Sequence, residues 1–277
     1  MKLKLRNAWV CLALMGLHAL AAAEVPAATA EALMHKSGIW SQLGDVAAQV
    51  KAGMAQASQD GSLPPDELKR LERIAEDAFA ASRLRDSVLQ ALSRDVTPAQ
   101  SAVALKWYDS PAGQKITAME EAFSTGFDDM NRVMTDGNQA LAKASPKRQS
   151  LLSQTVKASR AAEAMATMEI NVTLGILQGL ASAMPNPGKR ATADLRKVFD
   201  AKKPQMVASN RGVALSMSAL TYQSANDTLL EQYVKFLSSK SGAELTGSMM
   251  DALDQSLSKA AQRLGGAIPR APGTTSL

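Results

Sequence analysis

Few residues in this sequence could do nucleophilic or acid–base chemistry. Its 277 residues include one cysteine, Cys11, and two histidines, His18 and His35. Histidine has the ordinary pKa that best suits proton transfer near neutral pH. A Ser-His-Asp site outside the N-terminal segment 1–23 would have to use His35, and no Gly-x-Ser-x-Gly motif accompanies it. We therefore predict no catalytic residue of these kinds and interpret His35 as a surface or partly buried helix residue.

Carboxylates are the remaining candidates for chemistry. Glu120-Glu121 and Asp128-Asp129 lie close in the sequence. Helical spacing could bring Glu121 near Asp128, or Glu120 near Arg132. Two convergent acids could support a hydrolase or lyase that acts on envelope polymers. Solvated helix faces explain the same pattern, and we favour that interpretation.

Metal and cofactor sites are not predicted. A zinc site with two or more histidines would need more than His35, and no Asp-x-Asp calcium loop or P-loop is present. The 14 methionines include Met130/Met134 and Met165/Met168, whose helix-face spacing would suit copper(I). These positions coincide with apolar stripes, so we interpret them as core filler. If they lined a cavity instead, the chain would be a carrier of lipids or hydrophobic ligands.

The N-terminal segment 1–23 has the pattern of a secretory signal. Lys2, Lys4 and Arg6 precede an apolar run from Ala8 to Leu20, and Ala21-Ala22-Ala23 offers small side chains to signal peptidase. The apolar run is too short to span a bilayer comfortably. We predict cleavage after Ala23, export to the periplasm and a mature chain without a transmembrane segment. An uncleaved N-terminal anchor is the alternative.

Cleavage would remove much of the apparent reactivity. Cys11, His18 and three cations lie in the segment 1–23, so the net charge would fall from +5 to +2. No disulfide could then form within the mature chain. Lipidation of Cys11 is not expected, because this residue lies inside the apolar run. The mild charge, three tyrosines and two remaining tryptophans do not indicate nucleic-acid binding.

Composition and periodicity predict an all-α, multi-helix bundle. Ala, Leu, Met, Gln and Lys are common, the aromatic fraction is 4%, and β-branched clusters are scarce. Thr97-Pro98-Ala99-Gln100 resembles a capping box that begins a helix. Apolar spacing and turn residues predict helices over 31–58, from 66, over 84–92, from 97, from 110, and over 128–143, 147–184, 191–201, 204–222, 227–237 and 242–264. Gly38 and Gly44 could loosen the first of these helices.

One corner motif occurs twice in the chain. The first copy runs from Trp107 to Lys115 and the second from Phe236 to Glu244, at a constant offset of 129. In both copies an aromatic residue, a serine and a glycine coincide. The residues singled out are Trp107, Tyr108, Ser110, Pro111 and Gly113 in the first copy, and Phe236, Ser239 and Gly242 in the second. We predict two related helical units, residues 24–145 and 146–264, followed by a flexible tail over 265–277.

The first copy resembles the bacterial periplasmic family named domain of unknown function 2059. The hallmark of that family is an aromatic-Tyr-x-Ser-Pro-x-Gly-x-Lys corner between two helices, which residues 107–115 follow closely. The second copy departs from it, with Leu237 in place of tyrosine and Lys240 in place of proline. The resemblance implies export and a helical fold, and it implies no activity.

Local backbone tasks explain the motif without a ligand. Ser110 can cap a new helix at Pro111, and Gly113 permits close helix approach, while Trp107 and Tyr108 can pack the corner. We therefore expect a non-enzymatic interaction or scaffold protein whose partner is another periplasmic or envelope protein. The carboxylate-dependent enzyme and the hydrophobic-ligand carrier are the alternatives.

Overall fold

The structure, a computed structural model, describes residues 24–58, 65–126, 130–182 and 189–268. Helices make up these ranges without a strand, which confirms the all-α prediction. The helices are α1 (Ala27–Lys36), α2 (Ile39–Ala57), α3 (Pro65–Ala78), α4 (Ala81–Asp95), α5 (Pro98–Tyr108), α6 (Pro111–Gly126), α7 (Met130–Lys143), α8 (Pro146–Ala158), α9 (Ala161–Ser182), α10 (Lys189–Thr221), α11 (Asp227–Leu237) and α12 (Lys240–Ala267).

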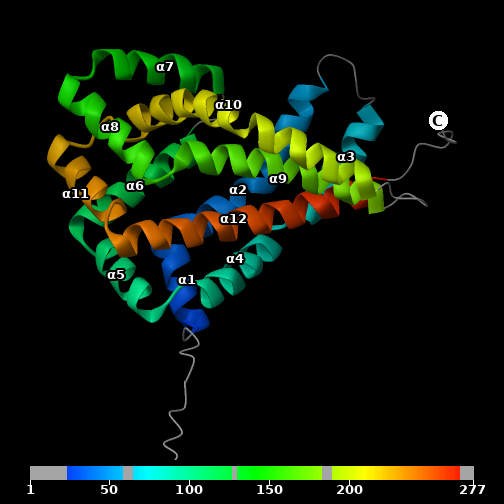
Figure 1. The fold of residues 1–277 in the computed structure, drawn as a ribbon, viewed down its shortest axis with the longest axis horizontal. Coiled ribbons are helices and arrows are strands. Elements are labelled where there is room, and N and C mark those ends of the chain that lie inside the picture. The colour runs from blue at the N-terminus through cyan, green and yellow to red at the C-terminus, as the bar shows by residue number, and fades with distance from the viewer. Residues whose placement is uncertain (1–23, 59–64, 127–129, 183–188, 269–277) are drawn as a thin grey trace, which may run out of the picture.

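The three longest helices define the long axis of the bundle. α9 packs against α10 and against α12, so it lies between them. Figure 1 shows α7, α8 and α11 gathered at one end, with α4 and α5 alongside α12. Within the described ranges, no helix combines the length and the apolar character needed to cross a bilayer.

Two predicted long helices are each broken in two, at residues with left-handed backbone. The helix predicted over 31–58 divides into α1 and α2 at Gly38, whose φ is +78°. The helix predicted over 147–184 divides into α8 and α9 at Arg160, whose φ is +53°. A residue in the left-handed region cannot continue a right-handed helix. Apolar periodicity persists across both breaks, which is why it predicted single helices.

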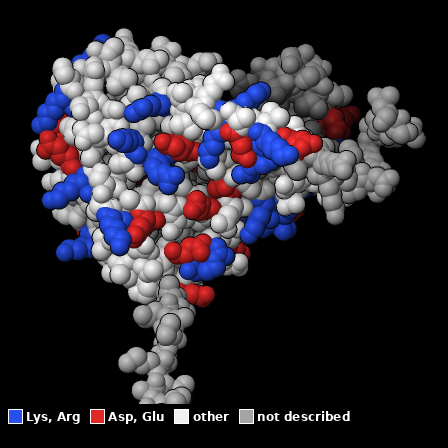
Figure 2. All heavy atoms as spheres, viewed as in Figure 1, with Lys and Arg blue, Asp and Glu red and all other residues white. Residues whose placement is uncertain are grey.

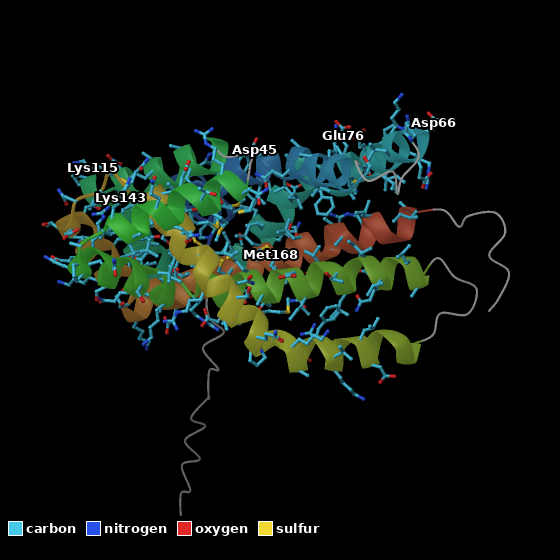
Figure 3. All side chains as sticks on the ribbon, turned by 90° about the horizontal axis from the view of Figure 1, so that it is seen from above. Asp45, Asp66, Glu76, Lys115, Lys143 and Met168 are labelled. Atoms are coloured by element: carbon cyan, nitrogen blue, oxygen red, sulfur yellow. The ribbon has the colours of Figure 1, made fainter. Side chains whose placement is uncertain are left out.

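Two predicted helix ends are also wrong. Pro204 was expected to separate helices over 191–201 and 204–222, but it lies inside the continuous α10. Proline removes one backbone hydrogen bond and bends a helix, yet contacts of α10 with α9, α7 and α8 hold the segments around it. Figure 3 shows the resulting change of direction along α10. α12 extends beyond its predicted end at Leu264, to Ala267, because Gly265 packs against α9.

Two clusters of buried apolar residues form the interior. The first joins helices α1–α5 to α12, with Leu33, Leu84 and Leu92 beside Leu245 and Leu264. The second joins α6, α8, α10 and α11 through residues that include Ile116 and Leu230. Each cluster combines residues from both sides of position 145. The predicted units 24–145 and 146–264 were defined by a repeat in the sequence, which the packing of the clusters does not test. The division into these units stays a prediction.

The offset of 129 recurs in the helix boundaries. α5 spans 98–108 and α11 spans 227–237, so both of their ends differ by 129. Thr97 and Asn226 cap these helices through bonds accepted from Gln100 N and Leu229 N. The predicted Thr97–Gln100 capping box is confirmed. The same spacing thus places equivalent caps before two helices of equal length.

Glycines allow α9 and α12 to touch along their backbones. A Cβ on Gly179 would lie 2.1 Å from the Gln262 carbonyl oxygen, and one on Gly265 would lie 2.1 Å from the Ile176 carbonyl oxygen. Gly175 is similarly close to the Ser258 carbonyl oxygen, at 2.6 Å. Real Cβ atoms do not approach oxygen so closely, so these positions admit glycine alone.

Gly179→Ala should therefore destabilise the fold, by about 1–3 kcal/mol, because its methyl group overlaps the backbone of α12. Gly212→Ala in α10 is the matched control, since no atom lies within 4 Å of its added Cβ. Alanine is the better helix former, so this control should gain about 0.5–1 kcal/mol. Urea titrations followed by circular dichroism compare the free energies of unfolding. Equal stability of the two variants would contradict the backbone contact.

Candidate functional site

The two corners of the repeated motif have the same local geometry. Ser110 Oγ accepts a hydrogen bond from Gly113 N at 3.0 Å and donates one to the Trp107 carbonyl at 2.6 Å. Ser239 Oγ makes the equivalent bonds with Gly242 N, at 3.1 Å, and the Phe236 carbonyl, at 2.6 Å. Each serine therefore caps the second helix of its corner and fixes the end of the first.

The glycine of each corner is required by the tightness of the turn. A Cβ on Gly113 would lie 2.1 Å from the Trp107 carbonyl oxygen, and one on Gly242 would lie 2.0 Å from the Phe236 carbonyl oxygen. Pro111 occupies the first position of α6, where its missing N–H leaves no bond unmade. Lys240 occupies the same position of α12.

Aromatic rings join the two corners to each other. The rings of Trp107 and Phe236 stack with their centroids 4.6 Å apart and their planes 5° apart. Tyr233 also stacks on Trp107, with centroids 5.9 Å apart, and Tyr108 meets Phe236 edge-on at 6.2 Å. The Tyr108 hydroxyl also approaches Met249 Sδ, at 3.9 Å. Residues far apart in the chain thus meet in one aromatic cluster.

Glu120 is the acid of this cluster. Its Oε1 accepts hydrogen bonds from the hydroxyls of Tyr222, at 2.6 Å, and Tyr233, at 2.8 Å. Burial raises the pKa of Glu120 above its ordinary value of 4.5 and nearby Glu121 raises it further, although the tyrosine bonds act in the opposite direction. Burial, chiefly, also raises the pKa of both tyrosines well above the ordinary value of 10.0.

Arg132 and His35, which the sequence also singled out, have partners of their own. Arg132 pairs with Asp136 at 3.5 Å, and Asp128 and Asp129 lie outside the described residues. His35 stacks on Trp40 with centroids 4.4 Å apart, and its side chain is 53% exposed. No group of three or more His, Cys, Asp or Glu suited to a metal occurs within the described ranges.

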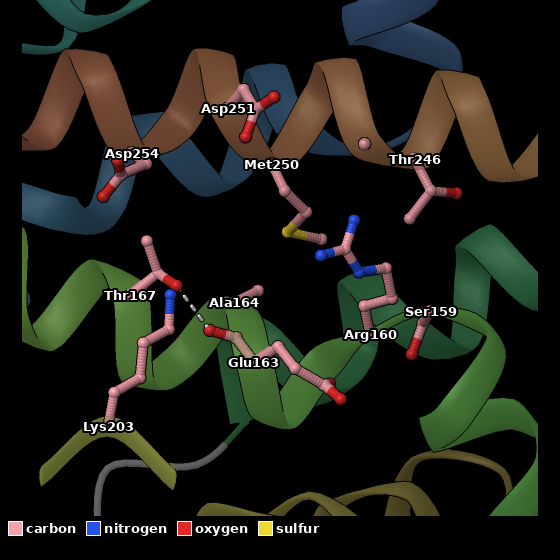
Figure 4. Close-up of a pocket in the computed structure, with 11 residues that line it drawn as sticks. Ser159, Arg160, Glu163, Ala164, Thr167, Lys203, Thr246, Met250, Asp251 and Asp254 are labelled. Carbon is pink, nitrogen blue, oxygen red and sulfur yellow. Dashed lines mark hydrogen bonds between the residues drawn. The ribbon is translucent and has the colours of Figure 1, made fainter. Parts of the chain in front are cut away.

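A hollow of about 270 Å³ lies over α9, between α10 and α12 (Figure 4). Its charged lining comes from four segments: Arg160 before α9, Glu163 on α9, Lys203 on α10, and Asp251 and Asp254 on α12. Among the described residues, none of these five side chains makes an ion pair within 4.0 Å. The hollow thus presents charges of both signs that are not joined in ion pairs among the described residues.

A polar network holds one wall of the hollow in place. Arg196 on α10 donates to Asn171 Oδ1 on α9 at 2.8 Å, and Asn171 Nδ2 donates to Asp254 Oδ2 on α12 at 2.7 Å. Asp254 Oδ1 is buried without a hydrogen-bond partner among the described residues. Burial raises the pKa of Asp254 above its ordinary value, against the opposing effect of the Asn171 bond. The sequence pattern indicated none of these contacts, which join three separate helices.

Residues 82–149 match a known family. It is the family described as uncharacterized protein conserved in bacteria, DUF2059. The predicted resemblance is confirmed over these residues, which contain the whole first corner and Glu120. The second corner lies outside the DUF2059 match, as does the hollow. No curated protein and no solved structure matches the chain.

The Glu120 cluster predicts a dependence of stability on pH. Because folding raises the pKa of Glu120, its contribution is fully present below pH 4.5 and is lost as the pH rises through the folded-state value. Glu120→Gln keeps an acceptor for both tyrosines and cannot ionise, so it should lose less stability than wild type as the pH rises above 4.5. Denaturant titrations at several pH values measure this difference.

Glu169→Gln is the control, since it removes an exposed carboxylate from α9. Glu120→Leu should cost more than either amide variant at every pH. It leaves two buried hydroxyls without an acceptor, at about 1–3 kcal/mol each. Parallel pH profiles for wild type and Glu120→Gln would contradict the assigned role of Glu120.

Proposed function

We propose that this chain is exported to the bacterial periplasm and binds another envelope protein there without catalysis. One observation carries the proposal: the hollow between α10 and α12 presents Arg160 and Lys203 together with Glu163, Asp251 and Asp254, all without ion-pair partners among the described residues. A protein segment that carries both a basic and an acidic side chain could pair with both sets of charges.

The arrangement of the charges favours recognition over chemistry. Catalytic carboxylates need a substrate-sized cavity beside them, and Glu120 and Glu121 are not among the residues that line the hollow. The Glu120 carboxyl is instead engaged by two tyrosines of the interior. Among the described residues, the surroundings of Glu120 and Glu121 therefore do not support the carboxylate-dependent hydrolase or lyase.

The hydrophobic-ligand carrier is also less well supported. The hollow has a volume of about 270 Å³, which is at or below the range of pockets that enclose a drug-sized molecule. Among the described residues of its lining, Met250 is the only methionine, and neither Met165 nor Met168 contributes. A small hollow with a charged lining suits a protruding side chain of a protein better than an acyl chain.

The outer surface of α10 adds a second feature typical of interfaces. Leu195 and Val198 lie three residues apart and are 36% and 49% exposed. The ion pairs Arg196–Asp200 and Lys197–Asp194 flank them. Apolar side chains within a charged rim resemble the anatomy of transient protein interfaces.

On the face seen in Figure 2, basic and acidic side chains are interspersed, which suits a protein partner better than the continuous negative charge of a nucleic acid.

Filling the hollow should abolish partner capture. Gly247 lines the hollow, and a Cβ added there meets no atom within 4 Å, so Gly247→Leu should fold while occupying the space. Gly53→Leu is the control, because its Cβ is equally unobstructed and lies on α2. Immobilised wild type and control are expected to retain the same protein from a periplasmic extract, and Gly247→Leu should lose it.

Charge reversal provides the second arm of this experiment. Lys203→Glu should weaken binding of the captured protein at least about tenfold, the effect of losing one charge-assisted contact. Affinities of the purified pair, measured by calorimetry, give the comparison. If Gly247→Leu and Lys203→Glu retain the partner as well as wild type does, the hollow is not the binding site.

The export proposal makes a separate prediction. The chain produced in a Gram-negative bacterium should be recovered from the periplasmic fraction with Glu24 as its first residue, as intact mass spectrometry will show. Replacing the small residues read by signal peptidase, in Ala21→Phe and Ala23→Phe together, should leave the segment 1–23 attached. A wild-type chain that stays in the cytoplasm with this segment would contradict export.

A further inference from the structure

A second hollow, of about 280 Å³, lies where the C-terminal ends of α3 and α12 meet. Its charged lining consists of Arg70, Arg73 and Arg263 with a single acid, Asp77. Ile74 and the small side chains Ala78 and Ala267 complete its lining. Three guanidinium groups around one small space are unfavourable unless an anion compensates them, since like charges repel.

Two acids near this hollow already have arginine partners. Arg70 pairs with Glu67, with Nε 2.9 Å from Oε2. Asp77 pairs with Arg83 of α4 at 3.1 Å. These pairs account for both acids and leave Arg73 and Arg263 without an ion pair among the described residues. The hollow therefore keeps two guanidinium groups that are not held in an ion pair with any described residue.

The negative ends of the neighbouring helices compensate only part of the positive charge of Arg73 and Arg263. Arg263 donates one hydrogen bond, from Nη2 to the Ala78 carbonyl at the end of α3, at 3.0 Å. A helix C-terminus carries about half a negative charge, so the ends of α3 and α12 together offset about one of the two cations. About one positive charge is left over. Burial, followed by repulsion from Arg83, lowers the pKa of Arg263, although attraction to Asp77 acts in the opposite direction.

We infer that this hollow is an anion-binding site for a phosphate group, held by Arg73 and Arg263. A guanidinium presents a planar fork of N–H donors that matches phosphate oxygens, and Arg263 uses one N–H for the cap and makes no other hydrogen bond to the described residues. The group could be free phosphate or the headgroup of an anionic lipid, which share this chemistry.

Calorimetric titration of the purified chain with inorganic phosphate at low ionic strength tests the site. Wild type should bind in the millimolar range or tighter, and Arg73→Gln should raise the Kd about tenfold. Arg73 is exposed, so this variant should keep its fold. Lys69→Gln is the matched control: it removes one exposed cation from the same helix outside the hollow, and its Kd should stay within about twofold of wild type.

A second arm distinguishes the two sources of phosphate. Sedimentation with vesicles of phosphatidylglycerol, compared with phosphatidylcholine, reports binding to an anionic headgroup. Binding in either arm that Arg73→Gln weakens and Lys69→Gln preserves supports the site and identifies its source. The proposal is overturned if wild type binds neither probe, or if Arg73→Gln and Arg263→Gln bind as wild type does while circular dichroism shows them folded.

Discussion

The close contact between α9 and α12 is the constraint on which the rest of the molecule depends. Three glycines let the two backbones approach until only hydrogen atoms separate a glycine from the facing carbonyl oxygen. This approach fixes α12 as the partner of α4 and α5 on one side and of α9 on the other. It also places Arg263 of α12 at the end of α3, where it caps the Ala78 carbonyl.

The aromatic cluster provides a second anchor at the opposite end of α12. Trp107 and Phe236 stack where the two corners meet, while Glu120 bridges the tyrosines of α11 and of the turn after α10. Burial makes this acid more costly to ionise, and its two phenolic donors offset only part of that cost, so its pKa is raised. The DUF2059 match contains the first corner and Glu120, but it contains neither Tyr222 nor Tyr233.

Short-range signals predicted the local parts of the fold well. The capping box at Thr97 and the positions of the corner helices follow from side chains that act within three or four residues. Gly38 marked a break that apolar periodicity concealed, and Arg160 gave no sign of its left-handed backbone because arginine rarely adopts it. At Pro204 the rule that proline ends a helix did not hold, because α10 packs against α9, α7 and α8 around this position. The contacts of Glu120 join it to Tyr222 and Tyr233, which lie too far along the chain for any spacing rule to reach.

The composition of the first core has a consequence for the order in which this protein can fold. Leu33, Leu84 and Leu92 share that core with Leu245 and Leu264, so the N-terminal helices lack part of their packing surface until α12 has been synthesised. Contacts of such long sequence separation form late, since the intervening chain must first lose its entropy. A nascent chain that has not yet reached Leu245 would therefore expose apolar surface, and its native packing must wait until α12 has been synthesised.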